Sequence, residues 1–247
     1  MRLLVSVTDA FEAGEALSGG AQIIDAKDPS RGALGAVGLD VFEEIVAAVG
    51  RRATVSAALG DARDEREIER VAAGFAECGA GFVKVGFANV SDPSRVAMLL
   101  AAVVRGALRG GRECGVVAVG YADASRVGAI EPWALLRVAA DCGVTGVLVD
   151  TADKAGPGLM GLWSVEQLGA WVDAVRAAGL VASVAGKITV GDISSVAQAG
   201  ADIVGVRGAA CNGGRAGRVS AERVRELVSR SGRLRFLASA AARLRSE

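Results

Sequence analysis

The sequence predicts an α/β fold, a single (β/α)8 TIM barrel that spans residues 1–247. Eight short apolar runs alternate with stretches of helical periodicity, which is typical of parallel strands buried on both faces. The sequence also shows a weak internal repeat of roughly 30 residues, which is close to the length of one βα unit. In this repeat A-E-C-G, A-D-C-G, R-A-A-G and A-Q-A-G each precede a strand. No linker interrupts the pattern, so one domain is expected.

The predicted strands share an apolar character and lie near 3–7, 21–27, 54–59, 81–86, 115–121, 146–150, 181–186 and 202–207. Several helical stretches between them end in glycine, which accepts the left-handed conformation that closes a helix. These predicted helix ends are Gly79, Gly143, Gly179 and Gly200. The basic, amphipathic tail at about 233–246 predicts a final helix packed on the barrel wall.

A doubly wound open sheet is the alternative arrangement of the same units. A dinucleotide-binding sheet of that kind carries a G-x-G-x-x-G turn after its first strand. Here the first strand runs into TDAFEAGEAL, which has no such turn. The sequence therefore favours the closed barrel.

Composition excludes several functional classes. The 28 cationic and 28 anionic side chains cancel, so no nucleic-acid surface is expected. The chain has no histidine, which removes histidine bases, Ser-His-Asp triads and histidine metal sites. The four cysteines lack C-x-x-C spacing and predict reduced thiols in a cytoplasmic protein. No apolar run approaches about 18 residues, so no membrane span is expected.

Lysine is rare in this chain and unevenly placed. Only four of the 28 basic residues are lysines, and each lies at or just beyond the end of a predicted strand: Lys27, Lys84, Lys154 and Lys187. Arginine replaces lysine as a surface cation but not as a neutral amine, because its guanidinium does not deprotonate in proteins. The pattern therefore predicts amine chemistry, with a simple lysine–aspartate ion pair as the alternative for each lysine.

Carboxylates are expected beside these lysines. The active sites of (β/α)8 barrels lie at the carboxyl ends of the strands. Asp25 and Lys27 are two residues apart and so share a strand face, and Asp150 ends the sixth strand. Asp123 follows the fifth strand and is expected to support the site from outside it.

The loops after the seventh and eighth strands commonly hold phosphate in such barrels. Gly186, Gly205 and Gly208 would allow close backbone approach, and Lys187 or Arg207 would supply positive charge. A pair of tight turns is the alternative. The segment KDPSRGALGA, residues 27–36, predicts a loop folded over the barrel mouth. Taken together, the residues indicate a class I aldolase-like barrel that acts on a phosphorylated carbonyl compound.

Longer motifs carry a more specific resemblance. The segments IIDAKDPSRGALGA, FVKVGFANV, GYADASRVGAI, LVDTADK and DIVGVRGAACNGG extend from the second strand to the eighth. They resemble the (5-formylfuran-3-yl)methyl phosphate synthase family of methanofuran biosynthesis, also called 4-(hydroxymethyl)-2-furancarboxaldehyde phosphate synthase. The resemblance implies a lyase that needs no metal or cofactor. Such a lyase condenses two glyceraldehyde 3-phosphates with loss of one phosphate and two waters.

The resemblance also implies a role for each residue. Lys27 would form the Schiff base and Lys84 would accept a proton, while Asp25 would orient Lys27. Asp150 and Lys154 would carry further proton transfers. The family usually has serine where this chain has Lys187, so Lys187 would either contact phosphate as a cation or point away.

Two other functions remain open at this point. One is a different class I aldolase or a triose-phosphate isomerase on the same barrel, and the other is a non-catalytic protein that binds phosphorylated metabolites. In each case the expected partner is a small triose phosphate, with neither nucleic acid nor membrane involved. The apolar stretch VAMLLAAVV, residues 96–104, suggests a subunit contact as well as core, so a homo-oligomer is also an expectation.

Overall fold

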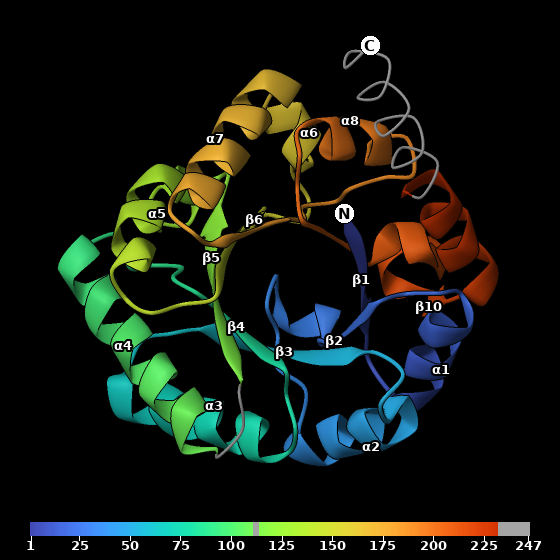
Figure 1. The fold of residues 1–247 in the computed structure, drawn as a ribbon, viewed down its shortest axis with the longest axis horizontal. Coiled ribbons are helices and arrows are strands. Elements are labelled where there is room, and N and C mark those ends of the chain that lie inside the picture. The colour runs from blue at the N-terminus through green and yellow to red at the C-terminus, as the bar shows by residue number, and fades with distance from the viewer. Residues whose placement is uncertain (111–113, 232–247) are drawn as a thin grey trace, which may run out of the picture.

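The described residues, 1–110 and 114–231 of the computed structural model, form a closed barrel of eight parallel strands (Figure 1). Each strand pairs with the next along the chain, and β8 returns to β1 through Arg2↔Ile203 to Val5↔Val206. The predicted (β/α)8 fold is confirmed. The strands are β1 (Arg2–Val7), β2 (Ile23–Ala26), β3 (Thr54–Asp61), β4 (Phe82–Gly86), β5 (Gly115–Tyr121), β6 (Gly146–Asp150), β7 (Val181–Val184) and β8 (Ile203–Val206).

Helices surround the barrel as an outer ring (Figure 1). They are α1 (Ala10–Ser18), α2 (Leu39–Val49), α3 (Glu65–Glu77), α4 (Pro93–Arg109), α5 (Pro132–Ala140), α6 (Leu159–Leu162), α7 (Val165–Ala177) and α8 (Ile193–Gln198). Residues 221–231 are also helical. The helix predicted at about 233–246 lies outside the described residues.

The glycines predicted to end helices have the expected conformation. Gly79, Gly143, Gly179 and Gly200 have φ angles of 99°, 70°, 75° and 84°. Side chains cap several helix starts: the carboxylate of Asp9, for example, accepts the backbone N–H of Glu12 at 2.8 Å.

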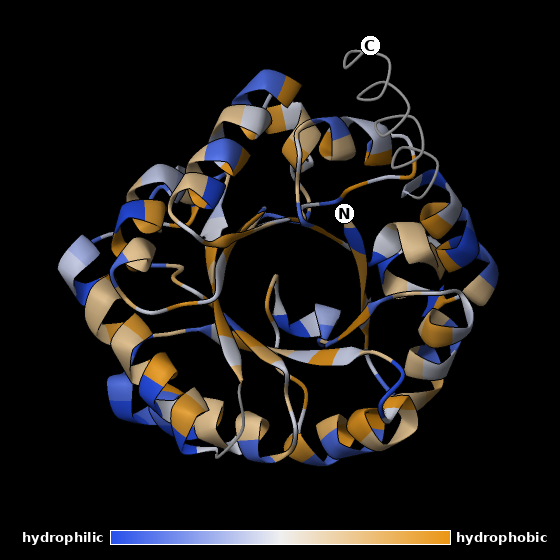
Figure 2. Ribbon diagram, viewed as in Figure 1, coloured by the Kyte–Doolittle hydropathy of each residue, from blue (hydrophilic) through white to orange (hydrophobic). Residues whose placement is uncertain are grey.

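The main core lies between the outer faces of the strands and the helices. Figure 2 shows hydrophilic residues mainly on the outer sides of the helices and hydrophobic residues along the strands. In α3, for example, Ile68, Ala72, Phe75 and Ala76 are buried, which is the helical spacing of one apolar face. Phe75 meets Phe42 of α2 edge-to-face, with ring centroids 5.0 Å apart.

The apolar stretch 96–104 belongs to α4. Leu99, Leu100 and Val103 of this stretch are buried against the barrel, whereas Met98 is 50% exposed. Packing on the barrel therefore explains most of its apolar character. Among the described helices, none combines the length and hydropathy needed to cross a membrane.

The loop after β2 lies across one end of the barrel, where the short helix η1 (Pro29–Arg31) appears inside the ring of strands (Figure 1). Its shape is held by the Asp28 N–H, which donates to the carbonyl of Gly35 at 2.9 Å. Leu34 is only 2% exposed and packs on Val119 and Tyr121 of β5 in a small apolar cluster. We call residues 28–36 the β2 loop.

After β8 the chain forms a hairpin before the helical residues 221–231. The hairpin consists of β9 (Cys211–Asn212) and β10 (Arg218–Val219), which pair antiparallel around η4 (Gly214–Ala216). Its turn is tight: a Cβ added at Gly217 would lie 1.7 Å from the carbonyl oxygen of Asn212. Residues 211–219 are called the β8 hairpin below.

Candidate active site

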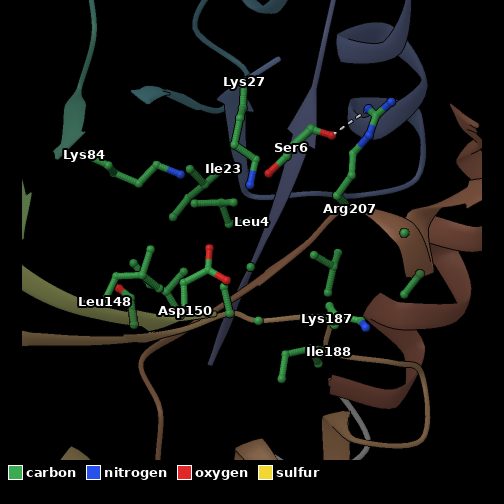
Figure 3. Close-up of a pocket in the computed structure, with 18 of the residues that line it drawn as sticks. Leu4, Ser6, Ile23, Lys27, Lys84, Leu148, Asp150, Lys187, Ile188 and Arg207 are labelled. Carbon is green, nitrogen blue, oxygen red and sulfur yellow. Dashed lines mark hydrogen bonds between the residues drawn. The ribbon is translucent and has the colours of Figure 1, made fainter. Parts of the chain in front are cut away.

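A cavity of about 570 Å³ opens among the residues at the carboxyl ends of the strands and reaches into the barrel interior (Figure 3). Lys84 and Asp150 point into this space from β4 and β6, and Lys27 does so from just beyond the end of β2. Lys154 lines it from the loop after β6. All four lysines singled out by the sequence therefore line one cavity. Leu4, Ile23 and Leu148 form part of its apolar lining.

Lys84 is paired with Asp25 inside the barrel. The Nζ of Lys84 lies 2.6 Å from Oδ2 of Asp25, and both side chains are almost fully buried. Asp25 also accepts hydrogen bonds from the hydroxyls of Ser6 at 2.9 Å and Ser56 at 2.7 Å. Strand register explains these contacts, because Asp25 is aligned with Ser6 on β1 and with Ser56 on β3.

This pairing places Asp25 against Lys84, whereas the sequence associated Asp25 with Lys27. The two serines had not been singled out by the sequence. The sequence feature that could have identified these serines is a hydroxyl residue within an otherwise apolar strand, as in LLVSV and TVSAAL. Such a buried hydroxyl needs a hydrogen-bond partner, and here the partner is the buried carboxylate.

Lys27 differs from the other three lysines because its amine has no hydrogen-bond or ion-pair partner among the described residues. The residue is 6% exposed. Burial lowers the pKa of Lys27 to about 8, helped by the nearby cations of Lys84 and Lys154, while Asp150 and Asp25 oppose the change. Roughly a tenth of this amine is therefore neutral, and nucleophilic, at pH 7, far more than for an exposed lysine.

Lys154 is paired with Asp150 across one turn of the loop after β6. The Nζ of Lys154 lies 2.7 Å from Oδ1 of Asp150 and also donates to the carbonyl of Thr151. Burial alone would raise the pKa of Asp150, but the charges of Lys154 and Lys27 outweigh it and hold this pKa below its ordinary value. Asp150 is therefore ionised at neutral pH.

Asp123 shapes the loop that carries Lys154. Its two carboxylate oxygens accept the backbone N–H groups of Ala152 at 2.7 Å and Asp153 at 2.8 Å. Asp123 is buried and is not part of the cavity lining. It thus supports the site from outside.

Gly186, Gly205 and Gly208 line the cavity where a phosphate was expected. Gly186 has a φ of 104°, and a Cβ there would lie 3.1 to 3.2 Å from Leu159 and Thr151, so the turn suits glycine. Lys187 also lines this region, but its side chain extends away from Lys27 and Asp150 (Figure 3). The Nζ of Lys187 donates to the carbonyl of Gly156.

Arg207, the other cation expected to contact phosphate, has its donors committed within the chain. Its guanidinium forms a buried, two-pronged ion pair with Glu12 of α1. The remaining N–H groups donate to the carbonyls of Ser6 at 3.1 Å, Gly217 at 2.9 Å and Arg215 at 3.3 Å (Figure 3 draws the first). All five guanidinium donors are used in this way, so Arg207 anchors the β8 hairpin to β1 and α1.

Arg215 was not singled out by the sequence, yet it lines the cavity from the β8 hairpin. It is half-buried, and its Nη2 donates to the carbonyl of Gly32 in the β2 loop at 3.0 Å. The available signal was an arginine flanked by glycines in C-N-G-G-R-A-G, directly after the eighth strand. Among the described residues, no group of three or more cysteine, aspartate or glutamate side chains is placed to hold a metal ion.

The fold and cavity define a class, the (β/α)8-barrel enzymes whose site lies at the carboxyl ends of the strands. Solved structures agree on the fold. A 3-hexulose-6-phosphate synthase superposes with a TM-score of 0.63 at 23% identity, covering 93% of this chain and 99% of that one. An orotidine 5′-phosphate decarboxylase from Pyrococcus horikoshii gives 0.64 at 16% identity, covering 93% and 98%.

The sequence comparisons identify the family. The model of the 4-HFC-P synthase family matches residues 3–228, so the chain belongs to this family of enzymes. The (5-formylfuran-3-yl)methyl phosphate synthase of Methanocaldococcus jannaschii is 41% identical over 230 residues, which cover 92% of this chain and 98% of the relative. The synthase of the same name from Methanopyrus kandleri is 40% identical over 214 residues, covering 86% and 90%. The resemblance inferred from the motifs is confirmed.

Proposed function

We propose that this enzyme condenses two molecules of glyceraldehyde 3-phosphate into 4-(hydroxymethyl)-2-furancarboxaldehyde phosphate for methanofuran biosynthesis. One phosphate and two waters leave as the furan ring forms, which balances the atoms of the two trioses. The observation that carries the proposal is the buried Lys27 amine, which has a pKa of about 8 and no partner among the described residues. Its relatives are named for the furan phosphate product.

In this mechanism Lys27 attacks the carbonyl of one triose phosphate and forms an imine with loss of water. The protonated imine then withdraws electrons from the adjacent carbon and so promotes carbon–carbon bond formation. The ammonium of Lys84 would first give a proton to the oxygen that leaves as water, and its free amine would then accept a proton from the substrate carbon. The Asp25 carboxylate holds the amine of Lys84 in place at 2.6 Å.

The loop after β6 would serve the later steps. Elimination of phosphate, and loss of water after ring closure, each require proton transfer to a leaving oxygen and from a carbon. Asp150 and Lys154 form a hydrogen-bonded pair at the cavity wall that can supply and accept such protons. Gly186, Gly205 and Gly208 would bind a substrate phosphate through backbone N–H groups.

A product assay tests the reaction. Incubation with glyceraldehyde 3-phosphate should produce furan absorbance together with one phosphate released per product. A triose-phosphate isomerase would produce dihydroxyacetone phosphate instead, and a binding protein would leave the substrate unchanged. Either of those two results would refute the proposed reaction.

A trapping experiment tests the nucleophile. Borohydride added during turnover should leave a reduced adduct on the peptide that contains Lys27, identified by mass spectrometry. An adduct on another lysine, or none in an active preparation, would refute the assignment. Lys27→Arg keeps the positive charge but cannot form an imine, so it should abolish turnover while circular dichroism shows an unchanged fold.

A further inference from the structure

The cavity has more positively charged side chains than negatively charged ones. Its lining contains seven cations and a single carboxylate, Asp150; the cations are Lys27, Lys84, Lys154, Lys187, Arg207, Arg215 and Arg223. Three of them are matched by Asp25, Asp150 and Glu12. The other four have no ion pair within the described part of the chain.

This excess of positive charge is larger than one phosphate requires. A phosphate monoester carries about −1.5 to −2 at pH 7, so two carry roughly −3 to −4. Lys27 keeps its positive charge as a protonated imine, so the four unmatched cations in one cavity suit two phosphate groups. Two phosphates are also what the proposed condensation brings into the cavity, and the inference below rests on that proposed function.

The expected phosphate position accounts for one of the two groups. Gly186 and Gly208, in the loops after β7 and β8, and Gly205, within β8, line the cavity together with Lys187. The backbone of Arg215 lies near the same region, since a Cβ added at Gly208 would lie 3.3 Å from the backbone nitrogen of Arg215. Its side chain then reaches Gly32 in the loop after β2. Because β1 lies between β8 and β2 in the barrel, Arg215 spans the sector next to Lys27.

Arg215 has both the donors and the support that an anion site needs. One N–H of its guanidinium is used on Gly32, and no other hydrogen bond of this side chain occurs among the described residues. Burial lowers the pKa of Arg215, an effect that Asp150 opposes and Arg207 increases. Partial burial of this positive charge costs solvation free energy, and a bound dianion would offset that cost.

The β8 hairpin fixes the position of Arg215. Arg207 donates to the carbonyls of Arg215 and Gly217 while its ion pair with Glu12 ties it to α1. Gly213 and Gly214, with φ angles of 84° and 76°, form the turn just before Arg215. A guanidinium held on a braced turn loses less conformational entropy on binding than a free side chain does.

We propose that Arg215 forms a second phosphate subsite, between the β8 hairpin and the β2 loop, which binds the phosphate monoester of the second triose. Arg207 is a positioning residue for this subsite through its bonds to the hairpin.

Calorimetric titration with sn-glycerol 3-phosphate tests the subsite. This probe is a phosphate monoester without a carbonyl, so it cannot form an imine and its binding does not depend on turnover. The wild type should bind two molecules per chain, and Arg215→Gln should bind one. Arg218→Gln is the matched control: it removes an exposed arginine of the same hairpin, which pairs with Asp9 at 3.3 Å, and should keep both sites.

Two results would overturn the inference: a wild type that binds only one molecule, or Arg215→Gln with two sites of unchanged affinity. In an active preparation, Arg215→Gln should also raise KM for glyceraldehyde 3-phosphate by about tenfold or more, the effect of losing one charged hydrogen bond. The wild type could make no furan and yet bind two molecules of sn-glycerol 3-phosphate while Arg215→Gln binds one. In that case the proposed reaction fails and the second subsite stands.

Discussion

Replacing Lys27 by methionine should stabilise the protein at neutral pH. The amine has an ordinary pKa of 10.5 when exposed and about 8 in its buried position. Near pH 7 the folded state therefore holds an ammonium that is disfavoured by about 3 kcal/mol relative to the unfolded chain. Methionine has a similar length and no charge, so it removes this penalty while filling the same space.

The predicted gain depends on pH in a defined direction. Because the pKa of Lys27 is lowered on folding, the penalty is fully present below about pH 8 and disappears as the pH rises toward 10.5, where the amine is neutral in both states. Lys27→Met should thus gain about 3 kcal/mol in the free energy of unfolding at pH 7, but less than about 1 kcal/mol at pH 10.

Urea unfolding of both proteins at pH 7 and pH 10 measures the effect. The control is Lys187→Met, the same substitution at an exposed lysine, which should change the free energy of unfolding little at either pH. A Lys27→Met protein that is no more stable than the wild type at pH 7 would refute the reasoning. So would an equal gain at both pH values, because that would indicate packing rather than charge.

Three further substitutions test two buried ion pairs and one close contact around the site. Glu12→Gln leaves the Arg207 guanidinium buried without a carboxylate and should lower the free energy of unfolding by about 3 kcal/mol, seen as a lower urea midpoint; an unchanged midpoint would contradict it. Gly86→Ala places a Cβ 2.3 Å from the hydroxyl of Tyr121 and should destabilise by about 1–3 kcal/mol in thermal unfolding, whereas an unaltered Tm would mean that the contact relaxes freely. Asp25→Asn removes the charge partner of a buried lysine and should abolish furan formation while borohydride still traps the imine, and full retention of turnover would show that this pair is not needed.

The strand pattern and the helix ends could be predicted from the sequence because both depend on local chemistry. A strand buried on two faces must be apolar along its whole length, and GVLVD and GVVAVGY satisfy this condition. A helix that closes in the left-handed conformation favours glycine, as Gly79 and Gly143 show. The placement of the lysines at the barrel mouth follows from the same strand ends.

The partners of the charged residues could not be predicted in this way. Asp25 meets Lys84 because β2, β3 and β4 have a particular register, which aligns Ser56 with Asp25 and turns Lys84 toward it. Arg207 pairs with Glu12, 195 positions away, only because β8 closes onto β1. Its sequence context, a cation after the eighth strand, suits a phosphate contact equally well.

The sequence by itself determined the barrel, the end of the barrel that holds the site, and the set of lysines and aspartates that meet there. It did so because hydrophobic periodicity and strand ends are local properties of the chain. Only the tertiary structure decided which lysine is left without a partner among the described residues and which groups hold the arginines of the cavity. Those outcomes depend on strand register and barrel closure, which bring Lys27, Asp150 and Arg215 around one cavity from distant parts of the chain.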